Sequence, residues 1–134
     1  MEKIEHLGIA VRDLEASNAL FEKLLGTAPY KEEEVASEQV RTSFFKNGPN
    51  KIELLQATHP ESAIARYVAK KGEGVHHVAF AVTDIVAEME RLKNEGFVLL
   101  NETPRRGADN KWVAFVHPKS ANGVLVELCQ EIKD

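Results

Sequence analysis

The sequence predicts an α+β fold built from two βαβββ modules, and three observations support this prediction. A motif near the start of the chain returns in the second half, a helix signal follows each copy, and each half ends in a strand that carries a glutamate. Self-similarity at a fixed offset is the signature of a repeated structural unit. We expect a first module at 1–58, a connecting helix within 59–73 and a second module at 74–134, together one compact domain.

The repeat becomes visible when the two halves are aligned. Two pairs of segments match, IEHLGIAVRD at 4–13 with VHHVAFAVTD at 75–84, and IELLQ at 52–56 with VELCQ at 126–130. The offset is 71 residues in the first pair and 74 in the second, which fits a small difference in loop length. A histidine, His6 or His77, therefore opens each half, and a glutamate, Glu53 or Glu127, closes it.

The elements of the first module follow from periodicity and from capping residues. Segment 4–11 is rich in β-branched and aliphatic residues that alternate, so it is predicted to be a strand. Asp13 stands where an N-cap belongs, and apolar residues at helical spacing follow it until Gly26 ends the helix. Three further strands are predicted around 30–35, 40–46 and 51–57, with a turn at 47–50 between the last two.

The second module repeats this order. A strand at 75–82 precedes a helix that Asp84 caps and that continues to Gly96. Between the modules, 60–71 is predicted to be the connecting helix. The remaining strands are predicted near 98–100, 112–117 and 124–130.

The two histidines lie on strand faces lined by small residues. Because side chains alternate along a strand, His6 shares its face with Gly8 and Ala10, and His77 shares its face with two alanines. The bulkier residues on the opposite face should cover the helix of their own module. Dense protein interiors normally fill space beside a side chain, so small neighbours at two equivalent places indicate a cavity.

The two glutamates point to metal chemistry. Glu53 and Glu127 each lie between apolar residues in a strand, where an inward-facing carboxylate must be paired, hydrogen-bonded or bound to metal. Two imidazoles and two carboxylates form a donor set that divalent transition metals accept, and an octahedral ion would keep two open positions. The remaining histidines are interpreted as ordinary core or turn residues, namely His59, His76 and His117.

Composition narrows the class of protein. A net charge of −4 without a basic run argues against a nucleic-acid partner. The single cysteine, Cys129, excludes an intrachain disulfide, and the sequence lacks a signal peptide pattern or a membrane-spanning apolar run. We therefore expect a cytoplasmic protein with no membrane partner.

Several motifs resemble the methylmalonyl-CoA epimerase family within the vicinal-oxygen-chelate superfamily, along nearly the whole chain. The HLGIAV motif is shared across the superfamily, whereas the double histidine after glycine and the HPKS and GVLVEL motifs are more particular to the epimerases. The motifs that carry the resemblance are HLGIAV at 6–11, IELL at 52–55, SAIARY at 62–67, GVHHVA at 74–79, HPKS at 117–120 and GVLVEL at 123–128.

The resemblance implies a glyoxalase-like fold, in which the two modules form an eight-stranded cup-shaped sheet around a metal. It implies an isomerase that interconverts (R)- and (S)-methylmalonyl-CoA by α-proton transfer through a metal-stabilised enolate. The metal ligands would be His6, Glu53, His77 and Glu127, and the identity of the ion (Co, Mn, Ni, Zn or Mg) is left open. The protein would be a homodimer that binds a CoA thioester.

The resemblance also assigns further residues. Inversion of a carbon needs proton exchange on both faces, so Glu127 and its repeat counterpart Glu53 are the candidate proton-transfer groups. Some members of the family carry Gln at the position of Glu53. Ser120 and Lys119 of the HPKS turn would bind the substrate carboxylate; the alternative is that this turn only shapes a hairpin. Some epimerases place another catalytic glutamate in the third strand, where this chain has Thr42, with Glu38 a few residues earlier.

Other functions of the same superfamily remain as alternatives. A glyoxalase I-like enzyme would use the same metal chemistry on a glutathione adduct, but the HPKS and GVLVEL motifs favour the epimerase. An extradiol dioxygenase needs three open metal positions, and Glu53 as a fourth ligand leaves too few. A non-catalytic small-molecule-binding protein would not need the full set of ligands.

Overall fold

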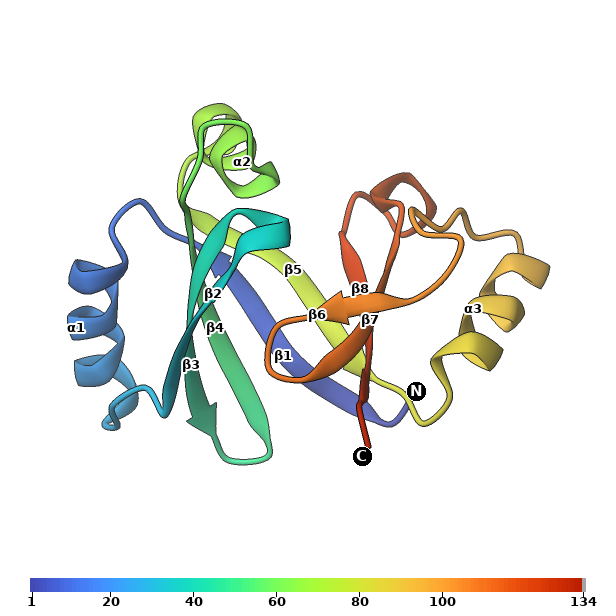
Figure 1. The fold of residues 1–134 in the computed structure, drawn as a ribbon, viewed down its shortest axis with the longest axis horizontal. Helices are drawn as coiled ribbons and strands as arrows, with labels where there is room; N and C mark the ends of the chain where they lie inside the picture. Colours follow the sequence, from blue (N-terminus) through green and yellow to red (C-terminus); the bar gives the residue numbers. More distant parts are fainter. Residues whose placement is uncertain (134) are drawn as a thin grey trace. The chain divides into compact units, whose positions relative to one another are not determined.

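The computed structural model describes residues 1–133, and eight β-strands and three α-helices are present in this part of the chain (Figure 1). Among the described residues, no helix has the length and apolar character needed to cross a membrane. The elements are β1 (Lys3–Ala10), α1 (Leu14–Leu25), β2 (Lys31–Val35), β3 (Val40–Asn47), β4 (Asn50–Ala57), α2 (Ala63–Lys71), β5 (Gly74–Ala81), α3 (Ile85–Asn94), β6 (Arg105–Gly107), β7 (Lys111–Val116) and β8 (Val126–Glu131), with short 3₁₀ turns η1 (Ala36–Glu38) and η2 (Pro118–Ser120).

The chain forms two compact units. One unit consists of residues 6–76, and the other consists of 1–5 with 77–134. The start of the chain joins the second unit through the N–H of Glu2, which donates to the carbonyl of Ala81 at 2.9 Å. The boundaries therefore fall inside β1 and β5. The modules expected at 1–58 and 74–134 remain predictions about how the domain is organised.

Each unit contains the same strand order. In the first, the strands lie in the order β2-β3-β4-β1, with β1 parallel to β4 and the other pairs antiparallel. In the second, the order is β6-β7-β8-β5, with β5 parallel to β8. Each parallel pair is joined by a connection that includes a helix, as parallel pairing requires. The predicted βαβββ order is therefore present twice.

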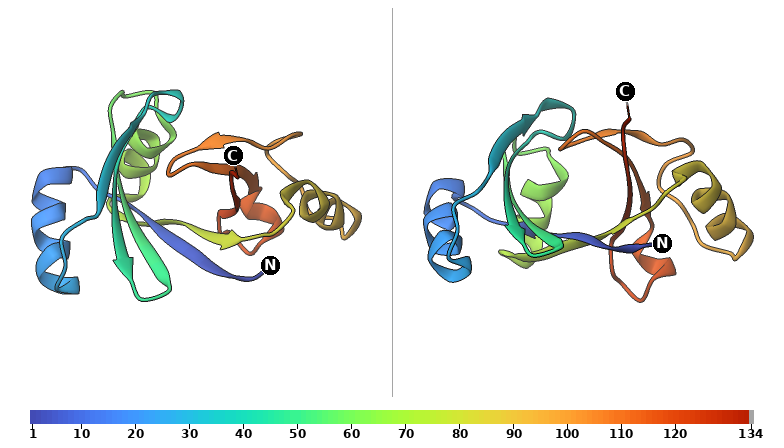
Figure 2. Two further views of the ribbon diagram at one scale, coloured as in Figure 1. Left: turned by 60° about the horizontal axis from the view of Figure 1, so that its bottom comes forward. Right: turned by 90° about the horizontal axis from the view of Figure 1, so that it is seen from below.

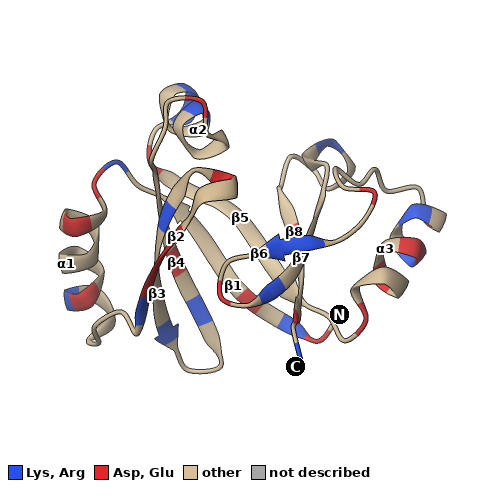
Figure 3. Cartoon of the chain, in the orientation of Figure 1, with Lys and Arg blue, Asp and Glu red and all other residues tan. Residues whose placement is uncertain are grey.

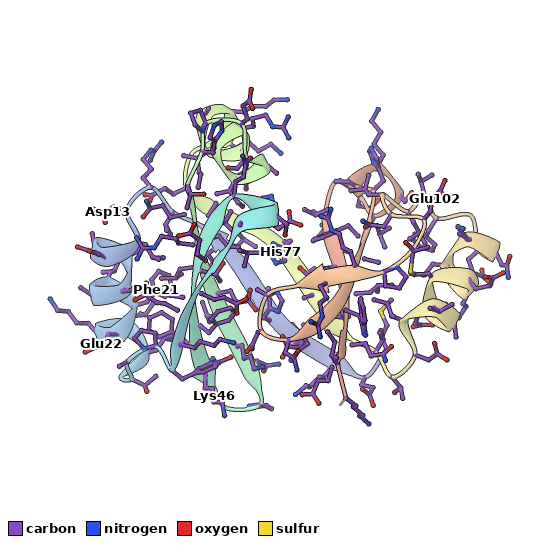
Figure 4. All side chains as sticks on the ribbon, viewed as in Figure 1. Asp13, Phe21, Glu22, Lys46, His77 and Glu102 are labelled. Atoms are coloured by element: carbon purple, nitrogen blue, oxygen red, sulfur yellow. The ribbon has the colours of Figure 1, made fainter. Side chains whose placement is uncertain are left out.

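The caps of α1 and α3 repeat as the alignment predicts. The Asp13 side chain accepts from the N–H of Ala16 at 3.2 Å, and the Asp84 side chain accepts from the N–H of Ala87 at 3.1 Å. Gly26 ends α1 in the left-handed conformation at φ 74°, which glycine adopts without steric cost. Figure 4 labels Asp13 at the start of α1.

A pair of glutamines ties each helix to the last strand of its unit. The amide oxygen of Gln56 accepts from the N–H of Leu14 at 2.6 Å, and that of Gln130 accepts from the N–H of Ile85 at 2.7 Å. Both acceptors satisfy an N–H in the first turn of a helix, which has no partner within the helix itself. The repeat therefore extends from the glutamates to the glutamines three residues later.

The apolar faces of the strands pack on the helix of their own unit, as predicted. One cluster joins β1 and β4 to α1, where Phe21 lies between helix and strands (Figure 4); its buried members are Val11, Leu14, Phe45 and Leu54. The other joins α3 to β7 and β8; its buried members are Val82, Ile85, Met89, Leu92, Ala114, Val116 and Leu128. The views in Figure 2 show each of these helices beside the strands of its own unit. Burial on this face leaves the opposite face of the strands for the histidines and glutamates.

The predicted strand near 98–100 is wrong, and the structure places β6 at 105–107 instead. Residues 98–100 do run along β7, but they form only an isolated bridge between Leu99 and Val116. The pairing is interrupted at Asn101, whose side-chain oxygen accepts from the N–H of Phe115 at 2.9 Å in place of a backbone carbonyl. Pro104 supplies no N–H for a ladder, so regular pairing resumes only at β6.

Candidate functional site

The first unit contains a buried histidine–glutamate pair. His6 lies on β1 and Glu53 on the neighbouring parallel strand β4, and their side chains are about 5% and 7% exposed. The Nδ1 atom of His6 lies 3.0 Å from Oε2 of Glu53. A buried carboxylate is costly unless a partner offsets its lost hydration, and the imidazole is such a partner.

The second unit contains the equivalent pair. His77 lies on β5 and Glu127 on the parallel strand β8, with side chains 6% and 9% exposed. The Nε2 atom of His77 lies 3.3 Å from Oε1 of Glu127. Figure 4 labels His77 on its strand. Within each unit, the structure thus brings together the histidine and the glutamate that the repeat predicts.

A phenylalanine and a cation lie beside the pair in the first unit. Phe44 on β3 is directly opposite Glu53 on β4, and it is fully buried. The ammonium group of Lys31 on β2 lies 5.6 Å from the centre of the Phe44 ring. Lys31 also forms an ion pair of 3.2 Å with Glu33. Beyond Phe44, the outer strand β2 therefore carries an ion pair on the same side of the sheet as His6 and Glu53.

The second unit has a similar arrangement. Phe115 on β7 is directly opposite Glu127 on β8, and its ring packs edge-on against the His77 ring with centroids 6.3 Å apart. The guanidinium of Arg105 on β6 lies 5.9 Å from the centre of the Phe115 ring. A cation over an aromatic face is attracted to the electron density of the ring.

Thr42 occupies the position where some epimerases are expected to carry a glutamate. It is 1% exposed, and its hydroxyl has no hydrogen-bond partner. Thr42 lies two residues before Phe44 on β3, so both side chains share the face of Glu53. Glu38 lies in η1, outside the strands. The sequence pattern marks this position but indicates no function for Thr42.

The HPKS turn forms η2 in the second unit. The hydroxyl of Ser120 accepts from the N–H of Val98 at 3.0 Å, so one of its acceptor positions holds the segment after α3. Lys119 is exposed. The imidazole of His117 accepts from the N–H of Lys119 at 3.0 Å and caps the turn. Ser120 therefore has a structural role in addition to the substrate contact that is predicted for it.

The two other histidines have ordinary roles, as the sequence analysis expected. The Nδ1 atom of His59 accepts from the N–H of Glu61 at 3.1 Å. The His76 ring packs edge-on against Tyr67 of α2 with centroids 4.9 Å apart, and burial lowers the pKa of His76 below 6.5. Neither residue is needed to explain a metal site.

The donor set fits a divalent metal. Each unit offers a buried imidazole nitrogen and a buried carboxylate oxygen, from His6 and Glu53 in the first and from His77 and Glu127 in the second. Imidazole nitrogen and carboxylate oxygen suit several first-row divalent metals, so the residues do not identify one. Because each pair is nearly removed from water, an ion bound beside it would compensate the buried negative charge of its carboxylate.

The fold and the two His–Glu pairs define the class of protein. The chain belongs to the glyoxalase/bleomycin resistance protein/dioxygenase superfamily, whose family model matches residues 5–115. The predicted class, an α+β glyoxalase-like fold of two βαβββ modules with eight strands, is confirmed.

Similarity to individual proteins narrows the class further than the superfamily does, because the relatives below are epimerases of acyl-CoA thioesters. The chain is 39% identical to the ethylmalonyl-CoA/methylmalonyl-CoA epimerase of Cereibacter sphaeroides over 130 residues, which cover 96% of this chain and 97% of the relative. It superposes on a variant of Streptomyces coelicolor methylmalonyl-CoA epimerase in complex with 2-nitronate-propionyl-CoA, with a TM-score of 0.95, 33% identity and 99% of each chain covered. A methylmalonyl-CoA epimerase in complex with methylmalonyl-CoA and ammonium matches with a TM-score of 0.93 and 34% identity, covering 98% of this chain and 95% of that one.

Proposed function

We propose that this protein is an isomerase that interconverts (R)- and (S)-methylmalonyl-CoA. The observation that carries the proposal is the buried His–Glu pair present at equivalent strands of both units. The similarity to methylmalonyl-CoA epimerases over nearly the full chain supports the same reaction. The substrate is then a CoA thioester with a carboxylate on its α-carbon, as in the relative that binds methylmalonyl-CoA.

The proposed metal ligands are His6, Glu53, His77 and Glu127. Their burial and their chemistry support this assignment, and it requires the two pairs to share one ion. When bound, a divalent metal would supply positive charge that stabilises the oxygen of the substrate enolate. The histidines hold nitrogen donors at fixed places on parallel strands, and the side chains of both pairs are buried from water.

Epimerisation requires a proton to leave one face of the α-carbon and another proton to arrive at the opposite face. Two acid–base groups on opposite sides satisfy this requirement. Glu127 is the proposed group on one side, and its repeat equivalent Glu53 is the counterpart. Both glutamates would also be ligands, and an ion favours the charged carboxylate, which weakens it as a proton acceptor. A group that is not a ligand would suit the second role better.

Ser120 and Lys119 are proposed to bind the substrate carboxylate. A hydroxyl and an ammonium group are suitable donors for an anion. The bond from Val98 to Ser120 leaves the hydroxyl hydrogen of Ser120 available for such a contact. Replacement of Ser120 by Ala should raise the Michaelis constant more than it lowers turnover, because a group that only binds acts equally on substrate and transition state. An unchanged Michaelis constant would remove Ser120 from the substrate site.

The oligomeric state and the cellular location are also proposals. We propose a homodimer in the cytoplasm, based on the resemblance to the epimerases. Sedimentation at micromolar concentration should give a dimer, whereas a strictly monomeric species would contradict this part of the proposal.

The function is tested by a coupled assay of methylmalonyl-CoA racemisation. Protein stripped of metal should be inactive, and reloading with Co, Mn, Ni, Zn or Mg in turn should restore activity with at least one ion. The glutathione hemithioacetal of methylglyoxal serves as a parallel substrate for a glyoxalase I-like enzyme. Turnover of that adduct without racemisation of methylmalonyl-CoA would refute the proposal in favour of this alternative.

A further inference from the structure

The ligand-bearing face of β1–β4 has a second polar feature besides the His6–Glu53 pair. The β-ladder fixes which side chains share this face, because residues directly opposite one another in neighbouring strands point to the same side. Gly8 is opposite Glu53 on β4, and Phe44 is opposite Glu53 on β3. Two residues further along β3 is Thr42, and directly opposite Thr42 on β2 is Glu33.

The Thr42 hydroxyl is an unpartnered polar group in the interior. Its oxygen is buried without a hydrogen bond, on a side chain that is 1% exposed. A buried hydroxyl without a partner costs about 1–3 kcal/mol, so its position calls for a ligand that hydrogen-bonds to it. The face that Thr42 shares with Glu53 is the face on which the substrate is expected.

Glu33 supplies the carboxylate beside this hydroxyl. Among the described residues on this face of β1–β4, Glu33 and Glu53 are the two carboxylates. Cross-strand neighbours have Cβ atoms about 5 Å apart, which brings the Glu33 carboxylate within reach of the Thr42 side chain. Glu33 is 31% exposed and paired with Lys31 at 3.2 Å, so its carboxylate has a cationic partner and contact with water.

The equivalent position in the second unit has neither a hydroxyl nor a carboxylate. Val113 is the counterpart of Thr42 on β7, and Arg105, directly opposite Val113, is the counterpart of Glu33. An isopropyl group and a guanidinium cannot accept a proton at neutral pH. If the outer strands of both units only shaped the site, the same apolar filling would serve in each of them. The difference points to a specific task for the pair in the first unit.

We propose that Thr42 and Glu33 together form the second proton-transfer group, which leaves Glu53 to hold the metal. This inference rests on the proposed epimerase function. The Thr42 hydroxyl contacts the substrate and the Glu33 carboxylate stores the proton behind it. In the forward step the C–H bond at the α-carbon breaks, its electron pair stays on the substrate as an enolate, and its proton moves to the Thr42 oxygen. Thr42 and Glu33 are not hydrogen-bonded in this structure, so the step requires a side-chain rotation on substrate binding that brings the Glu33 carboxylate to the hydroxyl. The hydroxyl proton of Thr42 then passes to Glu33 in the same step, and the reverse step returns it.

The test uses two substitutions with matched controls. Glu33→Gln keeps the size of the side chain and removes the acceptor, while Thr42→Val keeps the shape and removes the hydroxyl. Glu34→Gln changes the next, exposed carboxylate of β2, and Ser43→Ala removes the next buried hydroxyl, which has no partner either but lies on the opposite face. Thr42→Ser keeps the hydroxyl and should retain activity.

Each variant is given (R)- or (S)-methylmalonyl-CoA separately in deuterated water. Glu33→Gln and Thr42→Val should lose about 10²- to 10⁴-fold in epimerisation, the range typical of an acid–base group. Exchange of the α-proton without inversion should persist for one epimer only, because the group on the other side still works. The stability of Thr42→Val towards urea should be equal to or above that of the unmodified protein, since the hydroxyl that it removes is unpaired.

Three outcomes would overturn the inference. If Glu33→Gln and Thr42→Val epimerise as fast as Glu34→Gln and Ser43→Ala, the pair carries no proton. If exchange is lost equally from both epimers, the pair does not serve one face. If the unmodified, metal-loaded protein neither epimerises nor exchanges either epimer, the proposed function itself fails. The control variants distinguish the first two results from the third.

Discussion

The two units carry the same inner site. In each, a histidine on the first strand pairs with a glutamate on the parallel neighbour, at 3.0 Å for His6–Glu53 and 3.3 Å for His77–Glu127. In each, a phenylalanine on the next strand is directly opposite the glutamate, and a cation lies over its ring. The repeat has therefore kept the His–Glu pair and its aromatic neighbour.

The outer strands of the two units differ. Beside the phenylalanine, the first unit has Thr42 opposite Glu33, and the second has Val113 opposite Arg105. Figure 3 shows acidic residues on β2 and basic residues on β6. In a duplicated scaffold of this kind, the inner strands keep the His–Glu pair, whereas the outer strands differ in charge, with a glutamate in the first unit where the second has an arginine.

The largest expected effect concerns the two glutamates. Glu127→Gln should lower epimerisation by about 10²-fold or more, because it removes a proposed ligand and a proposed proton acceptor together. Glu53→Gln should be milder, since Gln stands at this position in some epimerases and Thr42 and Glu33 can still transfer the proton. Metal content and α-proton exchange are measured for both variants. Glu53→Gln with full metal and abolished exchange would reverse the two assignments.

A matched pair of core substitutions tests whether the units are equally packed. Leu54 and Leu128 occupy equivalent positions, each directly after the glutamate, and both are fully buried. Replacement by Ala should destabilise either unit by about 2–5 kcal/mol, because the substitution loses apolar contacts and leaves a cavity. Urea unfolding measures both losses. A loss below about 1 kcal/mol at only one of the two sites would show that its cluster is less tightly packed than the structure implies.

The glutamine caps should show smaller and equal effects. Gln56→Ala and Gln130→Ala each leave a helix N–H without its side-chain acceptor. The free energy of unfolding should fall by about 1 kcal/mol in each variant, the usual net value of one hydrogen bond. Thermal unfolding of the two variants provides the comparison. Unequal losses would mean that only one helix depends on its glutamine.

The smallest expected effect is on the free energy of unfolding, and it concerns the ion pairs of Glu88 in the second unit. The Arg91 guanidinium, which donates to Glu88 at 2.6 Å, holds the pKa of the Glu88 carboxyl below 4.5, and the N-terminal amine at 3.2 Å adds to this. A carboxyl with a depressed folded pKa stabilises the protein above its unfolded pKa and loses this contribution as pH falls through the folded pKa. Glu88→Gln should therefore cost less than about 1 kcal/mol near pH 7 and nothing in strong acid. A cost that does not change with pH would contradict the ion pairs as its source.

Much of the fold follows from local signals in the sequence. The strand faces of His6 and His77, the caps at Asp13 and Asp84 and the end of α1 at Gly26 depend on residues close in the chain, so alternation and capping rules predict them. The repeat then predicts one histidine and one glutamate at equivalent places in each half, and the structure places His6 beside Glu53 and His77 beside Glu127. The role of these four residues as metal ligands stays a prediction.

Other features depend on pairing between segments distant in the chain. The position of β6 could not be predicted, because the Asn101 side chain replaces a ladder contact to Phe115 on β7 and shifts regular pairing to 105–107. The neighbourhood of Thr42 and Glu33 likewise depends on the register of β2 against β3. Alternation places each residue on a face, but only the register decides which residues meet.

Under the proposed function, inversion of the α-carbon requires a metal ion bound by the His–Glu pairs. One measurement tests it directly: NMR of (S)-methylmalonyl-CoA in deuterated water with metal-loaded protein, metal-stripped protein and a double variant in which His6 and His77 are both alanine. The metal-loaded protein alone should produce the (R) epimer with deuterium at the α-carbon. Equal deuterium incorporation and inversion by all three samples would contradict it.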